Sequence, residues 1–467
     1  MSSKEDDRLS SLPNDIKITI LSLLPLKSAI STSILSRSWR YTWTRITAFR
    51  FTSPYYVTHK FYLNLYRTLG RMSWQQVYTV ELNIVPQTTT LGTVNLNMVK
   101  LGHYLLCNAH NIKEFKVKFE VNRYLISVPL CIFEMQSIEV LELGGITVIN
   151  PNINYKLPKL RELVIDDLCS FDLVFLGYLL KSCPMLEILR VNVDFREKTA
   201  YPIEIKSRNL RWVLINMSGA CRYSIQGEEE KVVFDAPKLE YLEFNSPIIL
   251  KFYFLQTPSE LLRAKLSLGD GKSNKRRADA ECGVGLKKRL LTVLNPICGV
   301  KSLSLSGDNI FISLRNRRID ENDVQVFEKL THVEMKLSST SNNSLYGVRR
   351  FLQRCPNLKS LVMLKKRGTY KWVINVLLTC LLETKLKNTS NWWEYDGSEY
   401  DMKLIFNFVN VVKDDTMMIE ITIHVYQDDQ FIKCINGFVL PNHLWRRPGF
   451  HKSKGRLAII YCKNRHV

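Results

Sequence analysis

The chain lacks the features that mark most secreted, membrane and disulfide-stabilised proteins. None of its apolar runs approaches the roughly 18 residues of a membrane span, and the charged N-terminus, MSSKEDDRLS, contains no apolar signal segment. The eleven cysteines are scattered and form no C-x-x-C pair, which favours reduced, mostly buried thiols over a disulfide framework or a zinc site. We therefore expect an intracellular protein that does not contact a membrane.

Sequence motifs of nucleotide-binding and hydrolytic enzymes are also missing. H-E-x-x-H, G-x-S-x-G and G-x-G-x-x-G do not occur, and the eight histidines are dispersed. Gly271, Lys272 and Ser273 match the end of a phosphate-binding loop, but Leu266 occupies the position where that loop needs its first glycine. We predict no catalytic residue, no cofactor and no metal ion, and hence a protein that is not an enzyme.

Positive charge is what the sequence has in excess. The 467 residues include 65 Lys and Arg against 44 Asp and Glu, a formal net charge of +21. Such a surface favours acidic partners, among them nucleic acid and acidic protein segments. Because 46% of the residues are apolar, the chain can form a large core, and its length indicates several domains or a repeat array.

The middle of the chain repeats an apolar-x-x-apolar-x-apolar frame. The fourth positions of the clear copies are spaced by 22, 26, 24 and 29 residues: Leu141, Leu163, Leu189, Val213 and Leu242. Looser copies start at residues 77, 112, 300, 331 and 358. Intervals of about 20–29 residues are typical of leucine-rich repeats, each with one strand and a return segment. One such unit cannot close its own core, so we predict an α/β solenoid of stacked repeats, with an ordinary α/β domain as the alternative.

A solenoid of this kind usually binds a macromolecule on its strand face. Polar residues in and beside the strands would then contact the partner, and candidates are Glu142, Glu162, Arg190, Arg211 and Glu243. The sequence does not identify this target.

The segment from residue 9 to residue 43 predicts three short helices. Pro13 suits the first turn of a helix, and Pro25 ends that helix. Trp39 and Trp43 lie four positions apart, so on a helix both indoles share one face. A unit this small rarely hides so much apolar surface by itself, so we predict that the indoles face another protein. A helical cap of the solenoid is the alternative.

The stretches LPNDI and ILSLLPLKSAISTSILSRSWRYTW resemble an F-box of the plant type. In that family the F-box docks onto a Skp-type adaptor, which connects through a cullin to the ubiquitin-conjugating machinery. The resemblance implies that the adaptor-binding residues are Leu12, Pro13, Ile16, Ile20, Leu24, Pro25, Leu35, Ser36, Trp39, Arg40 and Trp43. Departures from the family pattern are mild: Asn14 replaces the usual Asp, Ser38 a basic residue, and Thr42 a Leu.

An F-box followed by leucine-rich repeats resembles the plant F-box/LRR proteins, many of which end in an FBD region. We therefore predict a short three-helix F-box at residues 5–50, a leucine-rich-repeat solenoid (horseshoe) at 51–365, and an α+β, FBD-like C-terminal cap with a basic tail at 366–467. A helical stripe over 405–412 and an alternating strand over 419–425 support the cap, although the proline-rich lead-in of the FBD is missing.

The resemblance implies a function as well as a fold. It implies the substrate-recognition adaptor of an SCF (Skp-cullin-F-box) ubiquitin ligase, which holds its adaptor through the F-box and a target protein through the repeats. The alternative is a basic nucleic-acid-associated protein, or a scaffold, without a role in ubiquitin transfer. Nucleic acid is the less favoured partner, because a basic surface alone does not select it.

A polar, glycine-containing stretch at about 269–291 interrupts the repeats, and we predict a surface loop there. Two basic clusters in it resemble a bipartite nuclear import signal: Lys275, Arg276, Arg277, Lys287, Lys288 and Arg289. A solvated loop without a signal is the alternative. We accordingly expect the protein in the nucleus, the cytoplasm or both.

Overall fold

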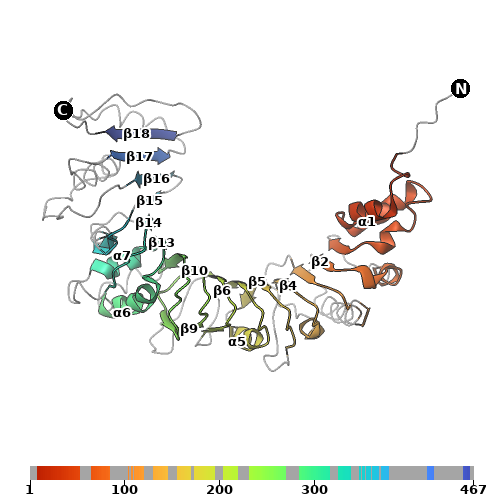
Figure 1. Cartoon of the computed structure of the whole chain (residues 1–467), viewed down its shortest axis with the longest axis horizontal. Helices are drawn as coiled ribbons and strands as arrows, with labels where there is room; N and C mark the ends of the chain where they lie inside the picture. Colours follow the sequence, from red (N-terminus) through yellow and green to blue (C-terminus); the bar gives the residue numbers. More distant parts are fainter. Residues whose placement is uncertain are drawn as a thin grey trace. The chain divides into compact units, whose positions relative to one another are not determined.

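The computed structural model of the chain (Figure 1) describes residues 8–52, 65–84, 104, 107–108, 110–119, 130–145, 155–169, 173–194, 203–218, 231–269, 283–315, 324–337, 347–348, 350–352, 354–358, 360–367, 370–377, 418–424 and 456–462. The chain divides into two units, residues 1–219 with 225–239 and residues 220–224 with 240–467. No helix among the described residues is long and apolar enough to cross a membrane.

The first unit starts with short helical segments. They are α1 (Asn14–Ser22), α2 (Leu26–Ser31) and the 3₁₀ helices η1 (Thr32–Ile34) and η2 (Thr42–Arg45). The third predicted helix is therefore not an α-helix. The N–H of Trp39 bonds to the Ser36 carbonyl and that of Thr42 to the Trp39 carbonyl, and this three-residue spacing is that of a 3₁₀ turn.

Parallel strands then follow one another in chain order, as the repeat frame predicts (Figure 1). They are β1 (Ala48–Thr52), β2 (Thr79–Ile84), β3 (Glu114–Phe119), β4 (Val140–Gly144), β5 (Glu162–Cys169), β6 (Ile188–Asp194) and β8 (Trp212–Ser218). Strand β1, at the boundary of the predicted F-box, is an additional strand that the frame did not identify.

The strand register explains why the frame repeats. The fourth frame positions pair across the strands and are at most 1% exposed: Phe49, Val80, Phe115, Leu141, Leu163, Leu189 and Val213. Residues two positions later form a second buried row, which includes Leu143 and Ile215. Side chains alternate across a strand, so both rows point into one core and the residues between them point outward.

Return segments cover the other side of that core. They include η3 (Trp74–Gln76), η4 (Leu130–Glu134), α5 (Leu173–Lys181) and the parallel pair β7 (Ile203–Lys206) and β9 (Lys231–Asp235). Helix α5 packs against β7, and Ile205 and Phe234 of the pair are fully buried. Cys183, just after α5, is also buried, and burial raises the pKa of its thiol to about 12.

The second unit continues the same plan and then changes it. Parallel strands β10 (Tyr241–Ser246), β12 (Arg263–Leu268), β13 (Ser302–Ser306), β14 (His332–Leu337) and β15 (Ser360–Arg367) are followed by antiparallel β16 (Tyr370–Leu377), β17 (Met418–His424) and β18 (Arg456–Cys462). Strand β17 coincides with the strand predicted over 419–425. The helix predicted over 405–412 lies outside the described residues.

The predicted loop at about 269–291 is wrong from Gly283 onward, where helix α6 (Gly283–Leu294) begins. Leu290, Val293 and Leu294 are fully buried on one side of it, and α6 packs against β11 (Lys251–Phe254) and α7 (Asp308–Arg315). The i, i+3, i+4 spacing of these apolar residues favours a helix, and the basic composition of the segment obscured it.

This helix also changes the interpretation of the second basic cluster. Lys287 is 2% exposed, and Arg289 Nη1 donates to the Ile249 carbonyl oxygen at 3.4 Å. An import receptor needs accessible side chains, which Lys287 does not offer in this fold. The first cluster, residues 275–277, lies outside the described residues, so the nuclear signal stays a prediction.

Candidate functional site

Two prolines define where the N-terminal helices begin. Pro13 (φ −55°, ψ 147°) directly precedes α1, and Pro25 (φ −58°, ψ 145°) directly precedes α2. Proline suits these positions because its φ is fixed and it has no N–H that a helix start would leave unsatisfied. Helix α1 ends at Ser22, so Pro25 separates the two helices as well as starting the second.

The predicted adaptor-binding residues fall into two groups by exposure. The exposed or half-buried group contains Leu12, Pro13, Ile16, Ile20, Leu24, Pro25, Leu35, Ser36 and Arg40. Trp39 and Trp43 are only 3% and 6% exposed. The first group is accessible to a partner, and the two indoles belong to the core of this chain.

The prediction that both indoles face another protein is therefore wrong. Helix α1 packs against η2, which contains Trp43, and both α-helices pack against β1. An isolated helical unit of this size could not bury two indoles. Strand β1 follows η2 almost directly, packs against both α-helices and pairs with β2, so the helical segment does not stand alone.

Trp39 packs against a buried lysine. Lys17 is 2% exposed, and its Nζ lies 5.5 Å from the centroid of the Trp39 ring. The same ammonium donates hydrogen bonds to the Ser10 carbonyl oxygen at 2.8 Å and to Ser38 Oγ at 3.1 Å. Cation–π contacts strengthen when water is excluded, so Lys17 fixes the ring and ties α1 to two neighbouring segments.

The helical segment exposes seven large apolar side chains, several of which the sequence analysis did not single out, and we call them together the apolar face. Its members are Leu9, Ile16, Ile20, Leu23, Ile34, Leu35 and Tyr41, exposed by 38 to 86%. Ile16, Ile20 and Leu23 lie at i, i+4 and i+7, on one side of α1, so the helical spacing alone could have identified Leu23. Exposed apolar clusters of this kind mark interaction surfaces.

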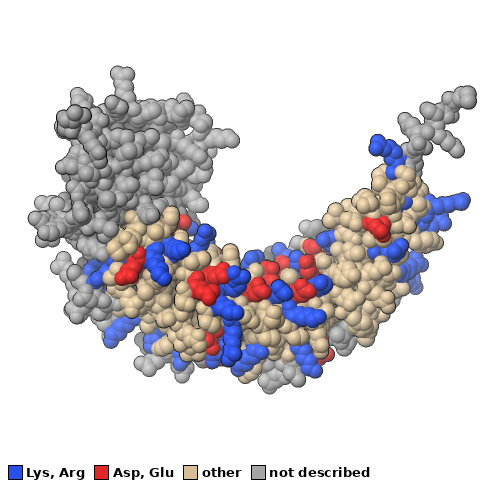
Figure 2. Space-filling model, in the orientation of Figure 1, with Lys and Arg blue, Asp and Glu red and all other residues tan. Residues whose placement is uncertain are grey.

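The apolar face belongs to a strongly basic segment. Residues 8–52 contain one carboxylate, Asp15, and seven cations: Arg8, Lys17, Lys27, Arg37, Arg40, Arg45 and Arg50. Figure 2 shows blue atoms prevailing at the end of the chain that carries α1, whereas blue and red atoms are mixed over the repeats. A partner with an acidic surface would complement this charge.

The outward residues of the strands are a second candidate surface. In the first unit the row between the buried rows is Arg50, Glu81, Lys116, Glu142, Val164, Arg190 and Leu214. It includes two of the predicted contact residues, Glu142 and Arg190. Arg50 and Glu81 form an ion pair at 3.3 Å, but exposed ion pairs add little stability. Val164 is only 6% exposed, so the charged members of the row are the ones accessible to a partner.

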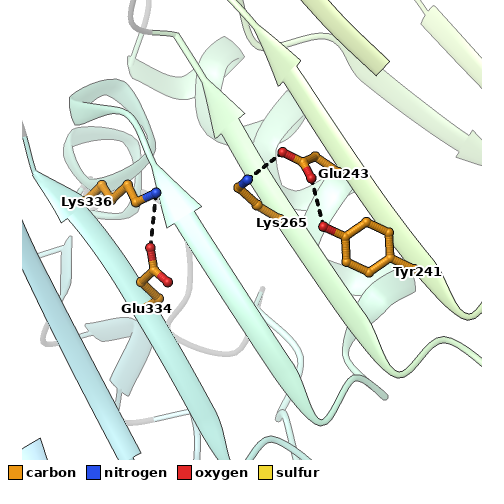
Figure 3. A network of polar contacts seen from close by, with 5 residues as sticks. All are labelled: Tyr241, Glu243, Lys265, Glu334 and Lys336. Carbon is orange, nitrogen blue, oxygen red and sulfur yellow. Dashed lines mark hydrogen bonds and ion pairs between the residues drawn. The ribbon is translucent and has the colours of Figure 1, made fainter. Parts of the chain in front are cut away.

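In the second unit the outward face carries a polar network (Figure 3). Glu243 accepts hydrogen bonds from Tyr241 Oη at 2.7 Å and from Lys265 Nζ at 2.5 Å, and Lys336 pairs with Glu334 at 3.1 Å. Burial alone would raise the pKa of Glu243, but hydrogen bonds from Lys265 and Tyr241 and the charges of Lys265 and Lys336 lower it overall. Burial, followed by the bond to Glu243, raises the pKa of Tyr241 to about 12.

Comparison with known proteins agrees with this order of elements. The F-box domain model matches residues 9–50, and a model described as FBD-associated F-box protein At5g56370, LRR repeats, matches residues 105–253. The F-box/FBD/LRR-repeat protein At1g78750 of Arabidopsis thaliana is 23% identical over 396 residues, which cover 80% of this chain and 81% of the relative. The FBD-associated F-box protein At4g10400 of the same plant is 24% identical over 411 residues, covering 85% and 88%.

A third relative is the Arabidopsis thaliana F-box/LRR-repeat protein At3g59200, 27% identical over 393 residues that cover 78% of this chain and 70% of the relative. This chain has an F-box followed by leucine-rich repeats and is similar to the plant F-box/LRR-repeat proteins. The F-box therefore comprises α1, α2, η1, η2 and the start of β1, and the apolar face lies on it. Within the described part of the chain, no group of three His, Cys, Asp or Glu side chains could hold a metal ion.

Polar contacts join the end of α1 to the segment around the start of β1 and to β2. Ser22 Oγ, at the end of α1, accepts the Thr47 backbone N–H at 2.9 Å, and the Ser22 carbonyl oxygen accepts from Arg50 Nη1. Arg50 also pairs with Glu81 of β2. A cation beside the carbonyl end of a helix is favourable, and Arg50 contacts both the end of α1 and Glu81 of β2, a strand outside the F-box match.

Proposed function

We propose that this F-box/LRR-repeat protein is the substrate-recognition subunit of an SCF-type ubiquitin ligase. The F-box holds a Skp-type adaptor, which connects to a cullin, and the outward face of the repeat strands holds a target protein. The subunit makes and breaks no covalent bond. It raises the effective concentration of target lysines near the charged conjugating enzyme.

The observation that carries this proposal is the exposed apolar face on a segment that matches the F-box model. A soluble domain leaves such side chains exposed when a partner covers them. The outward strand residues support the second half of the proposal, because a polar surface that adds little stability can be adapted to a target.

Ile20 tests the adaptor half. It lies in the middle of the exposed side of α1, so Ile20→Asp places a charge where the adaptor must exclude water, and we expect adaptor affinity to fall by at least about tenfold. Ser28→Asp is the matched control, because Ser28 is exposed and polar in the first turn of α2, where an acidic residue is tolerated.

Binding of the full-length variants to a recombinant plant Skp-type adaptor can be measured by isothermal titration calorimetry, with circular dichroism to confirm folding. Absence of binding by the wild-type protein would overturn the proposal. If the protein is instead a scaffold without a role in ubiquitin transfer, the adaptor should still bind. The abundance of captured target proteins should then be the same in plant cells that contain the intact protein and in cells that contain the Ile20→Asp variant.

A further inference from the structure

Three serine hydroxyls and one lysine ammonium meet beside the apolar face. Ser10 Oγ donates to Ser36 Oγ at 2.8 Å, Ser36 Oγ and Ser38 Oγ share a hydrogen bond of 2.9 Å, and Lys17 Nζ donates to Ser38 Oγ at 3.1 Å. We call these four residues the serine–lysine cluster. It joins three separate segments: the lead into α1, α1 itself, and the turn after η1.

The cluster contains donors but no anion. Within the described residues no carboxylate pairs with Lys17, whose ammonium donates to a backbone carbonyl and a hydroxyl. Trp39 Nε1, on the ring beside Lys17, is a buried donor with no acceptor. Arg37 and Arg40 flank the cluster and are exposed. A buried ammonium without a countercharge is unfavourable, so the site favours an added anionic group.

We propose that Ser38 is a phosphorylation site and that its phosphorylation weakens adaptor docking on the apolar face. This inference rests on the proposed function of the F-box. Ser38 is the exposed serine of the cluster, whereas Ser10 and Ser36 are half buried, so Ser38 presents the hydroxyl that a protein kinase can reach. It also hydrogen-bonds Ser36, the residue next to Leu35 of the apolar face.

The chemistry is a phosphoryl transfer from ATP by a protein kinase. Ser38 Oγ forms a bond to the γ-phosphorus, the bond from that phosphorus to the β-phosphate oxygen breaks, ADP leaves, and the hydroxyl proton passes to the base of the kinase. The phosphate brings a charge of about −1.5 to −2 and three acceptor oxygens. Since Lys17 Nζ already lies 3.1 Å from Ser38 Oγ, the new oxygens are within its reach.

Two consequences weaken docking. Lys17 turns toward the phosphate and releases the Ser10 carbonyl, which loosens the lead that carries Leu9 of the apolar face. The phosphate also sets a negative charge on a segment whose seven cations and single carboxylate favour an acidic partner, and like charges across an interface oppose association.

The test uses full-length protein and a recombinant plant Skp-type adaptor. We expect Ser38→Glu to weaken the Kd about fivefold and phosphoserine, incorporated genetically at position 38, about tenfold or more. Ser28→Glu adds the same charge on neighbouring α2, outside the cluster, so it keeps the general charge effect but not the contact with Lys17 and should weaken binding clearly less than Ser38→Glu. In a Lys17→Met background no ammonium can turn toward the added charge. Ser38→Glu should there weaken the Kd by a smaller factor than it does in the wild-type background.

The outcomes separate this inference from the proposed function. Failure of the unmodified wild type to bind overturns the proposed function. Normal wild-type binding with an unchanged affinity of the phosphoserine form overturns the regulatory role of Ser38 alone. Phosphopeptide mapping of the protein from plant cells, with phosphatases inhibited, should show phosphate on Ser38, and complete coverage of this peptide in unmodified form only would overturn the modification site.

Discussion

Replacing Trp39 by alanine tests whether the indole belongs to the core of this chain. The ring is 3% exposed, and truncating a buried tryptophan costs about 3–5 kcal/mol. Removing the unpartnered indole N–H recovers about 1–3 kcal/mol, whereas Lys17 loses a cation–π contact worth about 0.5–2 kcal/mol. The two corrections oppose each other, so we expect a net loss near the lower end, about 3 kcal/mol.

Hydrogen–deuterium exchange of the full-length protein measures this loss locally. Amides of α1 and α2 should lose about 100-fold protection, because 1.4 kcal/mol corresponds to a factor of about ten, while β4 to β6 stay protected. Trp39→Phe keeps most ring contacts and omits the unpartnered N–H, so its cost should stay below about 1.5 kcal/mol. Unchanged protection of Trp39→Ala together with lost adaptor binding would place the indole in the partner interface and refute the core assignment.

Two further predictions concern the repeats. Gly145 has a left-handed φ of +66°, and a Cβ there would lie 2.5 Å from the Phe119 carbonyl oxygen, so Gly145→Ala should cost about 2 kcal/mol or more; an unchanged urea midpoint would contradict this. Glu243 has a lowered pKa. Its contribution to the free energy of unfolding is therefore present above the unfolded pKa and disappears as pH falls through the folded pKa. Glu243→Gln should therefore lower the thermal midpoint at neutral pH, and the difference should shrink as pH falls below the unfolded pKa of about 4.3 and disappear once pH is below the folded pKa; a difference that persists in strong acid would refute the assignment.

The repeat strands could be predicted because their periodicity has one physical cause. Each strand contributes the same inward positions, so the frame recurs wherever large apolar residues fill them, as at Leu141 and Leu163. Strand β12 departs from this pattern, because small Ala264 pairs with Leu242 and Leu303 in the buried row. A smaller side chain at one position therefore hides a repeat from the sequence without removing it from the fold.

The candidate site was predictable only in part, because spacing locates a helix face but does not say what covers it. Ile16 and Ile20 are exposed on α1, as adaptor-binding residues should be. Trp39 and Trp43 are covered by the chain itself: Lys17 lies over the Trp39 ring, and α1 packs against η2, which contains Trp43. The Trp39 ring contacts Lys17, and a lysine is rarely buried. The sequence therefore offers no reason to place Lys17 in the core beside Trp39.

The register separates the residues that stabilise the repeats from those available for recognition. Inward residues such as Leu189 and Val191 are fully buried, whereas Arg190, between them on strand β6, projects outward. A substitution at an outward position changes a surface that contributes little to stability, but one at an inward position opens a cavity. The F-box lacks this separation, because Lys17 contacts the buried Trp39 ring and the exposed Ser38 at once. We therefore expect a change of charge at Ser38 to alter adaptor binding through the same Lys17 contacts that keep the F-box folded.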